Sequence, residues 1–208
     1  MIKALYLIFK PADAWVGILQ SQRRAGFLLA FYFLPMVLIA SAAEGFGLME
    51  WGRHQANIHR IHKFTFHEMM VYEMARFALA WLIIVVFAVL IKMFGDTFRE
   101  RNSYRQAFTL AIYGISPIFL LRLLEAVPGL NSWVPWGIGI ALSMEVIYRG
   151  IPGVLEPDPP NAIGLFFMIS LVLVAITGLE QFMTNWYLTG HIRALETVTS
   201  SLAAQLPL

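Results

Sequence analysis

Residues 77–91 read FALAWLIIVVFAVLI, a run without a charged residue, an amide side chain, a glycine or a proline. A helix of about 20 mostly apolar residues is needed to cross the hydrocarbon core of a bilayer, which is roughly 30 Å thick. Extended to residues 72–94, this run reaches that length. The stretch therefore predicts a transmembrane helix and makes the chain an integral membrane protein.

The composition of the whole chain agrees with this prediction. Of 208 residues, 59% are hydrophobic and only 13% are charged, and the mean hydropathy is +0.67. Soluble domains carry about 25% charged residues, so lipid must cover the excess apolar surface here. The net charge of +2 is not gathered into a basic face, which argues against a nucleic-acid partner. The chain has no cysteine, which excludes disulfides and thiolate metal sites.

Four further apolar segments predict an all-α, polytopic membrane bundle of five transmembrane helices. The predicted spans cover about residues 26–47, 72–94, 104–127, 132–148 and 161–183. Residues 1–25 form a separate N-terminal segment, in which Ala14, Trp15, Ile18 and Leu19 predict one face of a short interfacial helix. The transmembrane domain then covers residues 26–185, and residues 186–208 form a C-terminal tail.

Two prolines lie inside predicted spans. Pro117 has no N–H, so the carbonyl of Tyr113 loses its usual donor in the helix, and Ser116 offers a hydroxyl nearby. Pro35 does the same to the first predicted span at Phe31. We therefore expect helix kinks at Pro35 and Pro117.

The distribution of lysine and arginine predicts the orientation. With five spans, nine Lys or Arg residues fall on the side of the N-terminus and six on the other side. Cytoplasmic loops carry the excess of positive charge, so the N-terminus is expected in the cytosol and the C-terminus outside. Basic residues beside spans attract anionic lipid headgroups. The predicted contacts with headgroups, or with a protein partner, are Arg23, Arg24, Arg99, Arg101 and Arg105.

Three short motifs resemble the Ypt-interacting-protein (Yip) family. Residues 104–117, YRQAFTLAIYGISP, resemble the family's aromatic-X-Gln-Ala-Phe entry with a tyrosine and a proline four residues apart. Residues 147–152, IYRGIP, resemble the exit of the fourth span in bacterial members. Phe9-Lys10-Pro11 with Trp15 resembles the family's N-terminal opening. The resemblance covers about residues 9–185, but the acidic motif of the eukaryotic members is missing.

The resemblance implies five helices, a cytosolic N-terminus and no catalytic residues or cofactors. Likeness to bacterial members implies the bacterial cytoplasmic (inner) membrane. It does not carry over the trafficking role of the eukaryotic members, because the motif that accompanies that role is absent.

Charged and imidazole side chains are the remaining candidates for chemistry. Within the predicted helices, Glu73 with Arg76 and Arg122 with Glu125 stand three residues apart, so we expect each pair to neutralise itself near an interface. Glu44 and Glu180 have no such local partner, and we expect them at the interface. The loop before the second span holds weak candidates for a zinc or copper site: His59, His62 and His67. We predict no stoichiometric metal.

Two hypotheses of different class follow. The first is a non-enzymatic membrane protein of Yip type with a membrane-organising or adaptor role, in contact with lipids and with a second copy or another membrane protein. The second is a small transporter or channel with a polar site beside the proline-kinked helices. The sequence favours the first, because few charges lie near the middle of the predicted spans.

Overall fold

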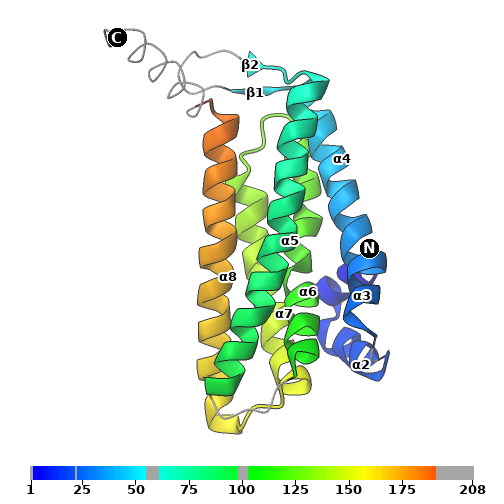
Figure 1. The fold of residues 1–208 in the computed structure, drawn as a ribbon, viewed down its shortest axis with the longest axis vertical. Coiled ribbons are helices and arrows are strands. Elements are labelled where there is room, and N and C mark those ends of the chain that lie inside the picture. Colours follow the sequence, from blue (N-terminus) through cyan, green and yellow to red (C-terminus); the bar gives the residue numbers. More distant parts are fainter. Residues whose placement is uncertain (1, 22, 55–60, 98–102, 191–208) are drawn as a thin grey trace, which may run out of the picture.

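The computed structural model describes residues 2–21, 23–54, 61–97 and 103–190. Long helices lie side by side along one axis, and a two-stranded hairpin lies at one end (Figure 1). We call this the hairpin end, and we call the opposite end, where α7 leads into α8, the pocket end. In chain order the elements are α1 (Ile2–Phe9), α2 (Pro11–Ser21), α3 (Ala25–Leu28), the π-helical turn η1 (Leu29–Phe33), α4 (Leu34–Glu50), β1 (Arg53–His54), β2 (Ile61–His62), α5 (Phe66–Thr97), α6 (Tyr104–Leu121), the 3-10 turn η2 (Arg122–Ala126), α7 (Trp133–Val154) and α8 (Pro159–Leu188).

Helices α5 and α6 begin where polar side chains satisfy their first N–H groups. The Ser103 hydroxyl accepts from the N–H of Gln106, whose side chain accepts from the N–H of Ser103, which completes a capping box. Thr65 and Glu68 exchange the same two bonds at the start of α5. Helix α5 therefore begins six residues before its predicted span and runs for 32 residues, about 48 Å at 1.5 Å per residue.

Four helical segments of the described chain are long and apolar enough to cross a membrane. They are Ala25–Glu50, Phe66–Thr97, Tyr104–Ala126 and Pro160–Leu188. The fourth predicted span, residues 132–148, lies within α7, which is not among these four. Helix α7 lies alongside the other helices and, with 22 residues, is about 33 Å long. The structure thus establishes an all-α membrane bundle.

Helix α6 forms the centre of the bundle. Its apolar segment is 72% buried, whereas the other three apolar segments are 28–33% buried and keep most of their side chains on the outer surface. Its closest neighbour is α7, because glycines remove side chains where the two helices meet. A Cβ at Gly139 of α7 would lie 2.9 Å from the Cα of Ile118, and one at Gly114 of α6 would lie 2.6 Å from a side-chain carbon of Ile147.

The N-terminal segment folds as two short helices, which pack against α6 and α7. The Trp15 indole donates a hydrogen bond to the Val146 carbonyl (2.9 Å) and packs edge-on against Tyr113. A Cβ at Gly150 would meet the Trp15 ring, so this glycine makes room for it. The sequence predicted one short interfacial helix within residues 1–25, with Ala14 and Trp15 on one face; the structure has two helices there, because α1 ends at Phe9 and α2 begins at Pro11. A second row of apolar side chains stays exposed: Leu5, Tyr6, Phe9, Val16 and Leu19.

Each proline inside a span has a local backbone feature. The π-helical turn η1 ends two residues before Pro35, with the N–H of Leu34 bonded to the carbonyl of Leu29. Near Pro117, the Ser116 hydroxyl donates to the Tyr113 carbonyl (2.7 Å), which the proline leaves without its helical donor. Both features accompany helix bends in proteins. The kinks at Pro35 and Pro117 stay predictions.

Two glycines of α7 offer a matched test of its contact with α6. In Gly139→Ala the new Cβ meets backbone, which cannot rotate away, so we expect a loss of stability of about 1–3 kcal/mol. Gly137 has nothing within 4 Å of its Cβ position, so Gly137→Ala should leave stability unchanged or raise it by up to about 1 kcal/mol. Thermal unfolding of both variants in the same detergent measures the difference. Equal midpoints would show that α6 and α7 are not held by this close approach.

Candidate functional site

A network of charged side chains lies inside the bundle towards the hairpin end. We call it the charge network; its members are Glu44, Tyr72, Glu73, Arg76, Arg122, Glu125 and Glu180. Arg76 is ten residues beyond the start of α5, about 15 Å along the helix, so the network lies well below the end of the bundle. Glu44 is fully buried, and Arg76 and Arg122 are only 4% and 5% exposed.

The two arginines share Glu44. Arg76 Nη1 contacts both carboxylate oxygens of Glu44 at 2.5 Å, and Arg122 Nε donates to Oε2 of the same group at 2.7 Å. The Tyr72 hydroxyl donates to Glu44 Oε1 at 2.7 Å. A buried carboxylate is tolerated only when donors surround it, and here Glu44 of α4 receives them from α5 and η2.

The remaining carboxylates complete the contacts of the arginines. Arg76 Nη1 donates to Glu125 Oε2 at 3.1 Å, and its Nε donates to Glu180 Oε1 of α8 at 3.0 Å. Arg122 Nη2 donates to Glu73 Oε2 at 2.7 Å. The network thereby connects α4, α5, η2 and α8, and it brings four carboxyl groups to two guanidinium groups.

This arrangement corrects the expectation that Glu73 with Arg76 and Arg122 with Glu125 pair within their own helices. Each arginine instead bonds carboxylates of other elements, and these side chains face the interior rather than the interface. The expectation for Glu44 was also wrong, because it is the shared acceptor of both arginines. In a low-dielectric interior, pairing across helices outweighs the weak attraction of neighbours on one helix.

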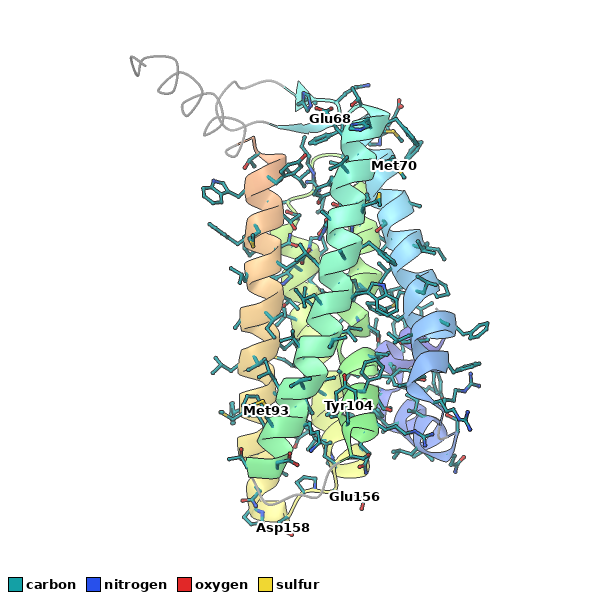
Figure 2. All side chains as sticks on the ribbon, in the orientation of Figure 1. Glu68, Met70, Met93, Tyr104, Glu156 and Asp158 are labelled. Carbon is teal, nitrogen blue, oxygen red and sulfur yellow. The ribbon has the colours of Figure 1, made fainter. Side chains whose placement is uncertain are left out.

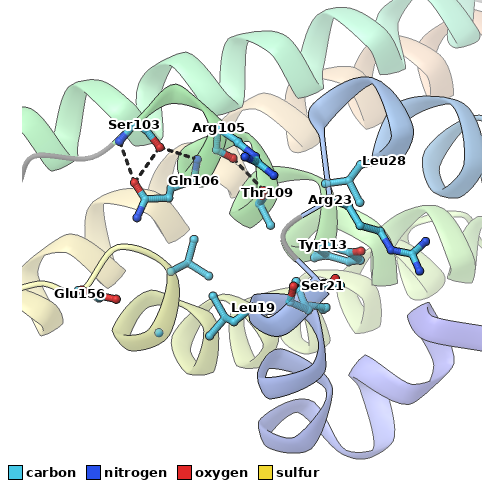
Figure 3. A pocket seen from close by; sticks show the side chains of 13 residues that line it. Leu19, Ser21, Arg23, Leu28, Ser103, Arg105, Gln106, Thr109, Tyr113 and Glu156 are labelled. Atoms are coloured by element: carbon cyan, nitrogen blue, oxygen red, sulfur yellow. Dashed lines mark hydrogen bonds between the residues drawn. The ribbon is translucent and has the colours of Figure 1, made fainter.

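A second candidate site is a pocket of about 440 Å³ at the pocket end, between α2, the start of α6 and the end of α7. Arg23 and Arg105, two of the five predicted contact arginines, line it, and Figure 3 shows Glu156 on the side opposite Arg23. Ser103 and Gln106 line it as well but bond each other in the capping box. The apolar part of the pocket wall consists of Ile18, Leu19, Leu28 and Val154.

The other predicted contact residues lie elsewhere. Arg24 is exposed and precedes α3 without lining the pocket, whereas Arg99 and Arg101 lie outside the described residues. The Arg23 guanidinium stacks over the Phe27 ring, 4.6 Å from its centre. The pocket therefore joins two of the predicted arginines to an apolar surface on α2.

The histidine candidates are not brought together in the part of the chain that the structure describes. His59 lies outside the described residues. His62 Nε2 lies 3.6 Å from Glu68 Oε2, and His67 is exposed on the first turn of α5. Within the described ranges, no group of three or more histidine, aspartate or glutamate side chains is arranged to hold a metal ion.

The family of the chain follows from its comparison with known families. Residues 5–182 match the family model described as the Yip1 domain. The chain belongs to the Yip1-domain family. The matched region runs from α1 to α8 and includes every member of the charge network. No curated protein and no solved structure gave a match to this chain.

The charge network of this Yip1 domain was not predicted from the sequence. One signal was present: the five glutamates and arginines Glu44, Glu73, Arg76, Arg122 and Glu125, together with Glu180, all lie towards the same predicted side of the membrane. Charges at one depth on several helices can meet in the interior. What the sequence does not show is which side of each helix they occupy.

Removing one network arginine should be far more costly than removing a surface arginine. In Arg76→Ala, three carboxyl groups lose a partner, the fully buried Glu44 among them, so we expect a loss of stability of about 3–5 kcal/mol. Arg149→Ala is the control, because Arg149 pairs with Glu145 on the surface of α7, with both side chains nearly half exposed. Such pairs contribute about 0–1 kcal/mol. Thermal unfolding in detergent compares the two, and similar losses would contradict a structural role of the network.

Proposed function

We propose that this Yip1-domain protein is a non-enzymatic membrane-organising or adaptor protein whose cytosolic face binds anionic lipid headgroups. The observation that carries the proposal is the pocket at the pocket end, where Arg23 and Arg105 stand beside apolar side chains of α2. A headgroup needs positive charge, and the acyl chain attached to it needs an apolar surface close by. The exposed apolar row on α1 and α2 provides more of that surface.

The proposal includes five spans with the N-terminus in the cytosol. Helix α7 then crosses the membrane as the fourth span, shielded in part by α6 and α8. Two observations support this. The N-terminal helices lie towards the pocket end whereas α8 ends at the hairpin end (Figure 1), as an odd number of crossings requires. The lysine and arginine count of nine against six favours the pocket end as the cytosolic one.

The outer surface of the bundle gives the proposed protein partner a place to bind. Large apolar side chains are exposed along α5 and α8, among them Leu82, Met93, Phe167, Leu171 and Phe182. In a membrane these faces contact lipid, a second copy or another membrane protein. We propose the cytoplasmic membrane of a bacterium as the location, on the resemblance to bacterial Yip proteins.

A small transporter or channel is the second candidate, and one observation favours it: four carboxyl groups meet two guanidinium groups inside a membrane bundle. Intramembrane carboxyl groups often mark ion or proton routes. The void beside Arg76, Glu125 and Glu180 measures only about 20 Å³, however, which is room for one water molecule. Proton or cation flux in proteoliposomes that is lost in Glu125→Gln would put this candidate first.

The headgroup site is tested by reversing charge inside and outside the pocket. We expect the double variant Arg23→Glu, Arg105→Glu to bind phosphatidylglycerol at least tenfold more weakly, since each basic residue near a surface contributes about 1 kcal/mol. The control is Arg24→Glu, Arg149→Glu, which changes the charge of the same end equally but spares the pocket. Binding of added phosphatidylglycerol to the delipidated protein in detergent is measured for both variants. If lipid binding weakens equally in the two variants, the arginines attract headgroups by their charge alone and the pocket is not a specific site.

Topology is tested separately with reporters fused to each end. With five spans and a cytosolic N-terminus, a reporter active only in the cytoplasm should be silent at the C-terminus and active at the N-terminus. A periplasmic reporter should give the opposite result. Cytoplasmic activity at both ends would mean an even number of spans. Helix α7 would then not cross the membrane.

A further inference from the structure

A groove on the membrane-facing side of the bundle, between α4 and α5, combines an apolar wall with two polar atoms that have no partner. Its volume is about 610 Å³, within the range of small-molecule sites. Figure 2 shows Met70 near the upper end of α5, on the side of α4. The groove is lined by Leu38, Ser41, Ala42, Phe46, Met49, Met69, Met70, Glu73, Met74 and Phe77.

The wall of the groove suits a flexible hydrocarbon chain. Four of its ten residues are methionines, whose side chains adapt to irregular shapes. Leu38, Phe46 and Met74 are each more than half exposed, so the groove opens directly to the membrane. Gly45 makes room for Met69, one of the lining residues, since a Cβ at Gly45 would lie 2.8 Å from the Met69 sulfur.

The two polar atoms are Ser41 Oγ and Glu73 Oε1. Both atoms are buried, and the Ser41 hydroxyl faces the Glu73 carboxyl group. Neither atom has a hydrogen-bond partner of good geometry among the described residues. Glu73 is only 7% exposed, and its other oxygen already accepts from Arg122, which fixes the carboxyl group in place. A buried polar atom without a partner is costly, so this pair indicates a ligand that supplies the missing hydrogen bonds.

The chemistry of the pair selects the polar group of the ligand. A carboxylate oxygen only accepts, whereas the serine hydroxyl both donates and accepts. One hydroxyl of a ligand can donate to Glu73 Oε1 and accept from Ser41. A phosphate, with acceptors and negative charge alone, would be repelled by Glu73, whose network already holds four carboxyl groups to two guanidinium groups.

The depth of the pair agrees with a lipid hydroxyl. Glu73 lies seven residues into α5 and Ser41 nine residues before the end of α4, about 10 Å and 14 Å from those helix ends. Because α5 is about 48 Å long and the hydrocarbon core is roughly 30 Å thick, the core begins about 9 Å inside each end of a centred α5. The pair thus lies just inside the boundary where the hydroxyl of a glycerol backbone resides.

We propose that the α4–α5 groove binds a neutral lipid with a free hydroxyl, of the diacylglycerol class, with the hydroxyl held between Ser41 and Glu73. The acyl chains lie along the methionine wall. This site faces the membrane near the hairpin end, and it is independent of the headgroup pocket at the opposite end.

The test is photolabelling of the purified full chain in nanodiscs with a photoreactive diacylglycerol. Label should fall on peptides of α4 and α5, and unlabelled diacylglycerol should compete at least fivefold better than the same lipid with its hydroxyl acetylated. In Ser41→Ala, affinity should fall about fivefold, which corresponds to one hydrogen bond of ordinary strength. In Ala42→Phe, a ring placed in the groove should abolish labelling.

Two controls separate this site from general effects. Ser170→Ala removes another buried serine hydroxyl without a partner, on α8 and away from the groove, and should leave labelling unchanged. Thermal unfolding of each variant confirms that it is folded; Glu73→Gln is a secondary variant because Glu73 also bonds Arg122.

Three results would overturn the proposal. Equal competition by the acetylated lipid would mean that any acyl chain fills the groove. Unchanged labelling in Ser41→Ala would mean that the polar pair does not hold the ligand. Cross-links between α4 and α5 of two copies, with no lipid label, would assign the groove to a protein contact.

Discussion

The guanidinium of Arg76 imposes the constraint on which the rest of the bundle depends. It is permanently charged and almost fully buried, and it belongs to a helix that crosses hydrocarbon. Such a charge is stable only where carboxyl groups reach it from several directions. Glu44, Glu125 and Glu180 do so from three other elements, so the axial position and rotation of α4, η2 and α8 are fixed relative to α5.

The two ends of the bundle are held together by different forces. Towards the hairpin end, charged hydrogen bonds determine which helices are neighbours. Towards the pocket end, contact depends on shape: Trp15 fits against Gly150 and bonds the Val146 carbonyl, so α2 closes over α6 and α7. Directional bonds specify one arrangement, whereas apolar packing tolerates small shifts. The pocket lined by Arg23 and Arg105 lies at the end that can adjust.

Apolar runs in the sequence predicted the all-α membrane class and the position of four spans, because lipid-facing residues dominate those helices. Helix α7 is harder to recognise as a span from its sequence, because it contains several glycines and polar residues. These are Gly137, Gly139, Ser143 and Glu145. The starts of α5 and α6 are local features, because the capping side chains stand three residues from the groups they cap. The charge network could not be predicted from the sequence. Partners such as Glu44 and Arg122 are 78 residues apart, and whether they meet depends on the rotation of each helix. The pocket depends likewise on α2 folding back.

The network contains more carboxyl groups than guanidinium groups, and this excess also explains the groove beside it. Two guanidinium groups offer donors to four carboxyl groups, and Glu73 bonds them through one oxygen only. A carboxyl group held by a single arginine is fixed in position yet still able to accept. Helix packing places Glu73 and Ser41 together in the lining of the groove between α4 and α5. The bonds that fix the helices therefore also fix the carboxyl group that we propose as the acceptor for a lipid hydroxyl.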